Sequence, residues 1–257
     1  LCMAANLGVR AGIPVALFTL EMSKAEVTQR LMCSEAKVES QRLRTGKLAA
    51  DDWPRLTAAC DKLAKAPIYV DDTGSITMME IRSKARRLKQ KHPELGLIIV
   101  DYLQLMTSGT SAENRVQEVS QISRSLKALA KELNVPVVAL SQLSRAIETR
   151  GDNTPRLSDL RESGALEQDA DVIMFLHRPS FYSKDALEEE ARKTAEVHIG
   201  KQRNGPTGKI EVAFISQYAR FENLAAARCH CPCRAVNPSA APPRQSRSRR
   251  GTPGATC

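Results

Sequence analysis

A run of four apolar residues that ends in an acid, Leu97-Ile98-Ile99-Val100-Asp101, constrains the fold of this chain more than any other feature. A continuous apolar run rich in β-branched residues is typical of a strand that is buried on both faces, as in a parallel sheet. Open α/β sheets bind their ligands at the carboxyl ends of such strands. A strand that ends at a helix-capping Asp has the same pattern, so the run alone leaves both interpretations open.

Strand-like runs alternate with helical patterns along the chain. Expected strands cover residues 15–20, 68–70, 97–101, 135–141, 171–177, 196–201 and 209–215, and expected helices cover 1–12, 23–37, 51–65, 77–91 and 116–133. The last two strands flank Asn204-Gly205-Pro206-Thr207-Gly208, which is a strong turn signal. This alternation predicts an α/β fold with a mainly parallel sheet flanked by helices, closed by a C-terminal β-hairpin.

Charge and composition change sharply after Leu224. The net charge is +9, but residues 225–257 hold six Arg and neither acid nor Lys, so +6 belongs to this tail and +3 to the rest. The basic balance therefore says little about nucleic-acid binding by the folded part. The tail is rich in Pro, Ala, Ser and Arg without apolar periodicity, which predicts disorder and places a domain boundary between 1–224 and 225–257.

The cysteines and the chain ends give weaker indications. The segment 229–233, Cys-His-Cys-Pro-Cys, resembles a metal site, but structural zinc sites need a second pair of ligands, so we interpret it as an accidental cluster. No apolar stretch approaches 18 residues and no signal-peptide pattern opens the chain, so we expect no membrane span and a cytoplasmic location. Leu1 is not a natural initiator, and we expect that upstream sequence is missing.

Two carboxylates follow the ends of two expected buried strands. Glu21 closes the strand at 15–20 as Asp101 closes the strand at 97–101. In P-loop NTPases an Asp at this strand position acts on the Mg²⁺ of the nucleotide. One carboxylate could hold metal-bound water while the other polarises a nucleophilic water. Alternatively, Glu21 is only a favourable negative charge at the start of the next helix.

Polar side chains at two further strand ends are candidates for sensing a nucleotide. Gln142 follows the strand at 135–141, where an amide could contact a γ-phosphate, although strand ends are commonly polar. Lys201 and Arg203 lie two residues apart, so the strand period sends both side chains to one face. Two cations beside a hairpin turn suit an arginine-finger role on a neighbour's nucleotide, whereas charges that only protect an edge strand would show the same pattern.

These motifs occur in one order. The order is Phe18-Thr19-Leu20-Glu21-Met22, then 97–106, 139–145, Asp159-Leu160-Arg161-Glu162-Ser163-Gly164 with 167–171, 201–208 and 217–224. Together they resemble the C-terminal RecA-like motor domain of the DnaB-type replicative DNA helicases of bacteria. The resemblance covers residues 1–224 and implies a RecA-like P-loop NTPase core.

The resemblance also implies roles for individual residues. Glu21 looks like the catalytic glutamate that activates the attacking water, and Asp101 like the Walker B aspartate that acts on Mg²⁺. Gln142 is similar to the glutamine that links the nucleotide state to the DNA-facing loops. Lys201 and Arg203 look like the pair that reaches the γ-phosphate of the next subunit.

A further segment, Arg161, Glu162 and Gly164, matches the loop that follows single-stranded DNA in the central channel of the family. By resemblance we expect a homo-hexamer that binds ATP and Mg²⁺ between subunits and unwinds duplex DNA by translocating on one strand. Primase and a helicase loader are the expected protein partners, and the bacterial cytoplasm, in association with the nucleoid, is the expected location.

The chain departs from the family at the phosphate loop. The family carries Gly-x-x-x-x-Gly-Lys-Ser/Thr, and this pattern occurs nowhere in the 257 residues. We therefore expect a helicase fragment that hydrolyses ATP poorly or not at all by itself. Two alternatives stay open: another RecA-like ATPase, such as a recombinase or a clock-type ATPase, and a catalytically inactive fragment that retains only binding or oligomerisation contacts.

Overall fold

The structure is a computed structural model that describes residues 1–107, 115–144, 147, 150, 152–160, 164–179 and 194–224. The chain divides into two compact units, Leu1–Leu224 and Ala225–Cys257. The second unit lies outside the described residues, so the disorder predicted for it and the interpretation of the 229–233 cluster stay predictions. None of the helices within the described ranges is long and apolar enough to cross a membrane.

A parallel four-stranded sheet forms the centre of the first unit. Its strands are β1 (Val15–Thr19), β2 (Ile68–Asp71), β3 (Leu97–Asp101) and β4 (Val137–Ala139). They lie in the order β2-β1-β3-β4, and every neighbouring pair is parallel. All five residues of β1 are buried, as is the apolar run of β3, which confirms the two-sided burial predicted from the sequence.

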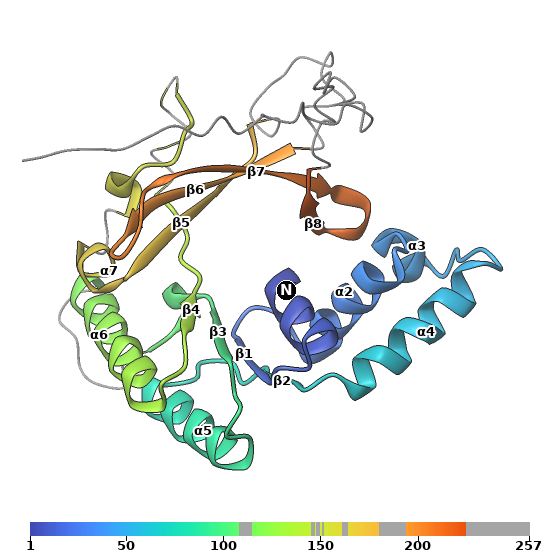
Figure 1. Cartoon of the computed structure of the whole chain (residues 1–257), viewed down its shortest axis with the longest axis horizontal. Coiled ribbons are helices and arrows are strands. Elements are labelled where there is room, and N and C mark those ends of the chain that lie inside the picture. Colours follow the sequence, from blue (N-terminus) through green and yellow to red (C-terminus); the bar gives the residue numbers. More distant parts are fainter. Residues whose placement is uncertain are drawn as a thin grey trace, which may run out of the picture. The chain divides into compact units, whose positions relative to one another are not determined.

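Helices cover both faces of this sheet (Figure 1). One face carries α1 (Cys2–Ala5), which continues as the π-helix η1 (Asn6–Arg10), together with α2 (Lys24–Ala36); α3 (Ser40–Thr45) and α4 (Asp52–Lys65) pack against α2. The other face carries α5 (Met78–Lys91) and α6 (Arg115–Leu133). Alternate strand residues therefore supply two cores: Ala16, Phe18, Ile98 and Val100 face α5 and α6, while Val15, Leu17, Leu97 and Ile99 face α1 and α2.

Local sequence signals set the helix boundaries. The predicted capping box is present at the start of α2, where the Ser23 side chain accepts from the Glu26 backbone N–H and the Glu26 carboxylate accepts from the Ser23 N–H. Thr77 and Glu80 form a second capping box at the start of α5. Gly12, which was expected to close the first helical segment, has φ +66°, a value that only Gly adopts without strain.

The C-terminal strands form a separate antiparallel sheet. Its strands are β5 (Val172–His177), β6 (Thr194–Gln202), β7 (Gly208–Ile215) and β8 (Arg220–Asn223), in the order β5-β6-β7-β8. The hairpin of β6 and β7 confirms the sequence prediction, whereas β8 was not predicted. The β6–β7 and β7–β8 connections are too short for the crossover that a parallel pair needs, so this half of the fold is antiparallel.

Two short helical elements lie between the sheets in sequence: η4 (Leu157–Leu160) and α7 (Gly164–Asp169). The antiparallel sheet is tied to the first layer by Arg220 of β8, whose Nη1 donates to the Ser34 carbonyl of α2 at 2.9 Å. On the opposite side, Ser123 of α6 donates to the Asp169 carboxylate of α7 at 2.8 Å. The hairpin is therefore linked to helices on both faces of the parallel sheet.

Candidate functional site

The carboxyl ends of β1 and β3 bring Glu21 and Asp101 to one edge of the parallel sheet. Thr19 and Asp101 are paired in register, and the Leu20 N–H donates to the Asp101 carbonyl at 2.8 Å. Glu21 follows immediately in the turn between β1 and α2, and it is exposed, whereas Asp101 is half-buried. The two carboxylates that the sequence analysis singled out therefore lie at adjacent strand ends.

The charge of this edge is unbalanced. Burial, and after it the negative charge of Glu21, raise the pKa of Asp101, while the Leu1 amino group and Arg30 act in the opposite direction. Among the described residues no cationic side chain forms an ion pair with either carboxylate. A divalent cation would relieve this repulsion, so the donor set fits Mg²⁺.

The number of carboxylates also agrees with magnesium. In the part of the chain that the structure describes, no three His, Cys, Asp or Glu side chains gather in a way that could hold a metal ion without further ligands. Mg²⁺ usually keeps several waters and binds through one or two carboxylates together with phosphate oxygens. Glu21 and Asp101 can supply the protein side of such a site, but the chain contains no Gly-rich loop to cradle the phosphates.

A buried threonine fixes the turn that carries Glu21. Thr19 is 2% exposed, and its hydroxyl donates to the Met22 carbonyl at 3.0 Å and accepts from the Met22 N–H at 3.1 Å. The Ser23 and Glu26 capping box begins at the next residue. Glu21 is therefore held between two hydrogen-bonded elements, although its own side chain faces solvent.

Gln142 lies just beyond β4, in a segment that a second glutamine clamps. The Gln104 side chain donates to the Ser141 hydroxyl at 2.9 Å and to the Gln142 carbonyl at 3.2 Å, and it accepts from the Gln142 N–H at 3.3 Å. Gln104 belongs to η2 (Leu103–Leu105), which directly follows Asp101 and Tyr102. The Gln142 segment is thus attached to the chain that leaves the Asp101 strand.

Lys201 and Arg203 lie together on one side of the hairpin, as their spacing predicted. Lys201 Nζ donates to the carbonyls of Glu167 and, at 3.3 Å, Gln168. Arg203 Nη2 donates to the Gln168 carbonyl at 3.0 Å, and its Nε lies 3.4 Å from an Asp171 carboxylate oxygen. In this structure both cations therefore contact the end of α7 in their own chain.

The candidate DNA-binding loop is only partly visible. Arg161 and Glu162 lie outside the described residues, so their predicted roles stay predictions. Gly164 is exposed and is the first residue of α7, and a Cβ added there would meet nothing within 4 Å. The loop therefore leads directly into the helix whose other end receives Lys201 and Arg203.

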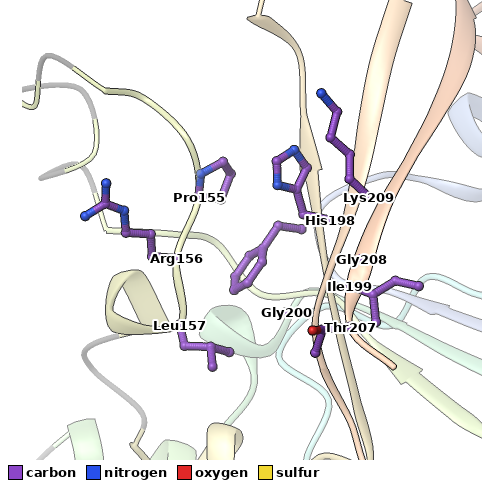
Figure 2. A pocket seen from close by; sticks show the side chains of 10 residues that line it. Pro155, Arg156, Leu157, His198, Ile199, Gly200, Thr207, Gly208 and Lys209 are labelled. Carbon is purple, nitrogen blue, oxygen red and sulfur yellow. The ribbon is translucent and has the colours of Figure 1, made fainter. Parts of the chain in front are cut away.

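A pocket of about 460 Å³ lies against the antiparallel sheet (Figure 2). Pro155, Arg156 and Leu157 form one wall, and His198 and Lys209 lie across from them. The cations here are already matched: Lys209 and His198 lie 2.6 and 2.7 Å from Glu196, and Arg156 lies 2.7 Å from Asp152. None of the described site residues lines this pocket, so it does not replace the strand-end site.

The space beside Gly200 also limits this pocket. A Cβ at Gly200 would lie 2.6 Å from the Phe175 ring and 3.5 Å from Leu157. The pocket floor therefore depends on a glycine next to Lys201. The neighbouring His177 is buried, and this burial lowers its pKa, which favours the neutral ring.

Comparison with known proteins identifies the family. The model of the DnaB-like helicase C terminal domain matches residues 1–223. The chain belongs to this family.

Several relatives of known identity align with the same region. The chain is 53% identical to the replicative DNA helicase DnaB of Geobacillus stearothermophilus over 223 residues, which cover 86% of this chain and 48% of that protein. It is 49% identical to the replicative DNA helicase DnaC of Bacillus subtilis (strain 168), with the same coverage of both chains. The chain therefore spans about half the length of these DnaB-family relatives.

Solved structures agree with this assignment. One of them, an ATPase domain solved on its own, superposes with a TM-score of 0.82 at 40% identity, covering 86% of this chain and 78% of that one. A DnaB-like replicative helicase, whose structure was solved to show its interactions with primase, gives a TM-score of 0.80 at 40% identity, covering 84% of this chain and 52% of that one. The RecA-like fold expected from the sequence is thereby confirmed.

Three residues of this DnaB-family chain were missed by the sequence analysis as parts of the site. Thr19 fixes the Glu21 turn, Gln104 clamps the Gln142 segment, and Asp171 contacts Arg203. Thr19 did carry a signal, because a polar residue interrupts a strand that is otherwise buried and apolar. Gln104 and Asp171 carried none, because their roles depend on partners that lie far away in sequence.

Proposed function

We propose that this chain is the motor part of an ATP-driven replicative DNA helicase. The observation that carries the proposal is the placement of Glu21 and Asp101 at adjacent strand ends in a chain of the DnaB-like family. In the proposed assembly, a ring of six subunits binds ATP between neighbours and translocates along single-stranded DNA. The work of translocation separates the duplex.

The two carboxylates have different proposed roles. Bound Mg²⁺ would supply charge stabilisation for the phosphoryl group that is transferred. Asp101 would hold that ion, because its half-buried carboxylate is at the strand end and its burial disfavours an uncompensated charge. Glu21 would accept a hydrogen bond from the attacking water and orient it, for which an exposed carboxylate on a fixed turn is suitable.

The opposite side of each ATP site would come from the next subunit. We propose that Lys201 and Arg203 leave their contacts with α7 and approach the γ-phosphate of a neighbour's nucleotide. An Arg in this role stabilises charge that develops in the transition state. Gln142 would report the state of the nucleotide, and its attachment to Gln104 would pass a displacement between this segment and the chain that follows Asp101.

Arg161, Glu162 and Gly164 would form the DNA-facing loop of the motor. The exposed start of α7 at Gly164 supports this role, because backbone without a side chain permits close approach of another backbone. The finer proposals of primase and a loader as partners, and of a nucleoid-associated location in the bacterial cytoplasm, rest on the family. The structural relative solved to show primase interactions supports the first of these.

A second candidate function is a binding or oligomerisation module without catalysis. The observation that favours it is the absence of a phosphate-loop pattern from the 257 residues. Without the backbone donors and the Lys of that loop, the charge of a triphosphate has no partner on the strand-end site.

The two functions are separated by comparing this chain with a full-length subunit. We define the full-length subunit as this chain preceded by the phosphate loop and N-terminal domain of the Geobacillus stearothermophilus relative. DNA-stimulated ATP hydrolysis and strand separation by the full-length subunit, abolished by Glu21→Gln, would support the motor. A folded, hexameric full-length subunit that neither hydrolyses ATP nor separates strands would refute it and favour the binding module.

A further inference from the structure

The position of Arg203 raises the question of what holds it when no neighbour is present. Its guanidinium lies at the end of α7, where Nη2 donates to the Gln168 carbonyl at 3.0 Å and Nε faces Asp171 at 3.4 Å. The Arg203 N–H also donates to the Asp171 carbonyl at 2.9 Å, which fixes the backbone of the pair. Arg203 is therefore attached to residue 171 through both its main chain and its side chain.

Asp171 is also bound from the other side by α6. Lys127 Nζ forms an ion pair with the Asp171 carboxylate, so the carboxylate lies between two cations. The Lys127 side chain is 25% exposed, whereas those of Asp171 and Arg203 are 56% and 52% exposed. Arg203 is thus accessible to an outside anion while Asp171 remains anchored to the body of the domain.

We propose that Asp171 is a positioning residue that holds Arg203 on its own subunit and competes for this guanidinium with the nucleotide of the neighbour. The proposal rests on the proposed trans role of Arg203. A carboxylate is a suitable competitor, because it and a phosphate offer the guanidinium the same paired acceptor oxygens. The contact would keep Arg203 from productive engagement until a bound triphosphate outweighs it.

The electrostatics of the cluster support an ionised Asp171. Its hydrogen bond with Lys127, together with the charges of Lys127, Arg203 and Lys131, holds the pKa of the Asp171 carboxyl below its ordinary value. The carbonyls of Glu167 and Gln168 add the negative end of the α7 dipole at the same place. Arg203 and Lys201 therefore share one cluster of acceptors within their own chain.

Lys127 allows the proposal to be separated from a purely structural role. Asp171→Asn and Lys127→Met both remove the ion pair between α6 and residue 171, so a structural effect should be similar in the two variants. Their effects on Arg203 differ in sign: Asp171→Asn removes the competitor, whereas Lys127→Met leaves Asp171 with Arg203 as its remaining direct ion-pair partner in the described chain. The first change should release Arg203, and the second should hold it more firmly.

The test measures kcat/KM for ATP in full-length hexamers without DNA. We expect Asp171→Asn to raise kcat/KM by roughly two- to fivefold, the scale of one half-exposed ion pair, and Lys127→Met to lower it by a similar factor. Both variants should show similar decreases in melting temperature. Asp152→Asn is the matched control for loss of one carboxylate, because Asp152 pairs with Arg156 and contacts neither Lys201 nor Arg203 in the described structure.

The outcomes distinguish this proposal from the proposed function beneath it. If Arg203→Ala abolishes turnover but Asp171→Asn and Lys127→Met shift kcat/KM in the same direction, or leave it unchanged, the positioning role of Asp171 is refuted. If Arg203→Ala retains turnover, the trans role itself fails.

Discussion

The hydroxyl of Thr19 should contribute to both the stability of the fold and the turnover of the motor. Thr19→Val keeps the shape of the side chain but removes the hydroxyl that donates to the Met22 carbonyl and accepts from the Met22 N–H. The side chain is 2% exposed, so water cannot replace the lost partner from inside the sheet. The turn that carries Glu21 should therefore loosen.

The size of the effect follows from the two hydrogen bonds. Each contributes about 0.5–1.5 kcal/mol net, so Thr19→Val should lower the free energy of unfolding by about 1–3 kcal/mol. For a domain of this length, a loss of about 2 kcal/mol lowers the melting temperature by roughly 6 °C. Thr19→Ser is the matched control, because it keeps the hydroxyl and removes only a buried methyl group, at a cost of about 1 kcal/mol.

Two assays check this prediction. Thermal unfolding of the 257-residue chain, followed by circular dichroism, should show the larger decrease for Val. In the full-length subunit, kcat should fall for Val and be largely retained for Ser, since only Val removes the support of the Glu21 turn. Equal kcat values for the Val variant and the unmodified protein would refute the positioning of Glu21 by Thr19.

Three further predictions concern the same strand-end site. The 257-residue chain alone should hydrolyse ATP poorly or not at all, because it lacks phosphate-loop donors, and a phosphate-release assay with DNA that found robust turnover would contradict this. In full-length subunits, Glu21→Gln should retain ATP binding and lose turnover, whereas Asp101→Asn should weaken both, as calorimetric titration and phosphate release can measure; equal losses of binding would contradict the separate roles. Because the pKa of Asp101 is raised in the folded chain, its ionisation costs stability as pH rises through that pKa. Asp101→Asn should therefore raise the melting temperature of the chain at pH 7 and leave it unchanged below the ordinary carboxyl pKa, and a lower melting temperature at pH 7 would oppose this.

Local patterns in the sequence predicted the parallel half of the fold. The apolar run that ends at Asp101 indicated β3, and Ser23 with Glu26 indicated the start of α2. These features depend on residues close together in sequence. The strand order, and the pairing of Thr19 with Asp101 that brings Glu21 beside it, follow from long-range contacts and could only be expected from the general rules of α/β sheets.

The antiparallel half was predicted less completely. The turn at 204–208 indicated its hairpin, but β8 is short, half-buried and rich in polar residues, so it showed no strand pattern. The spacing of Lys201 and Arg203 correctly predicted a shared side of the hairpin. Their acceptors on α7 and at Asp171 could not be predicted, because they lie more than 30 residues away in sequence.

The central claim is that each catalytic site combines Glu21 of one subunit with Arg203 of the next. Arg203→Ala alone should nearly abolish turnover, since an Arg finger contributes on the order of 10³–10⁵ in rate. Glu21→Gln alone should also abolish it.

The most direct measurement mixes these two inactive full-length subunits and follows ATP hydrolysis without DNA. Mixed rings contain interfaces where an intact Glu21 meets an intact Arg203 from its neighbour, so the account predicts that part of the activity returns. Subunit exchange is verified independently by energy transfer between labelled subunits. If hydrolysis stays absent although mixing is complete, Arg203 does not act on a neighbour's nucleotide, and the account is contradicted.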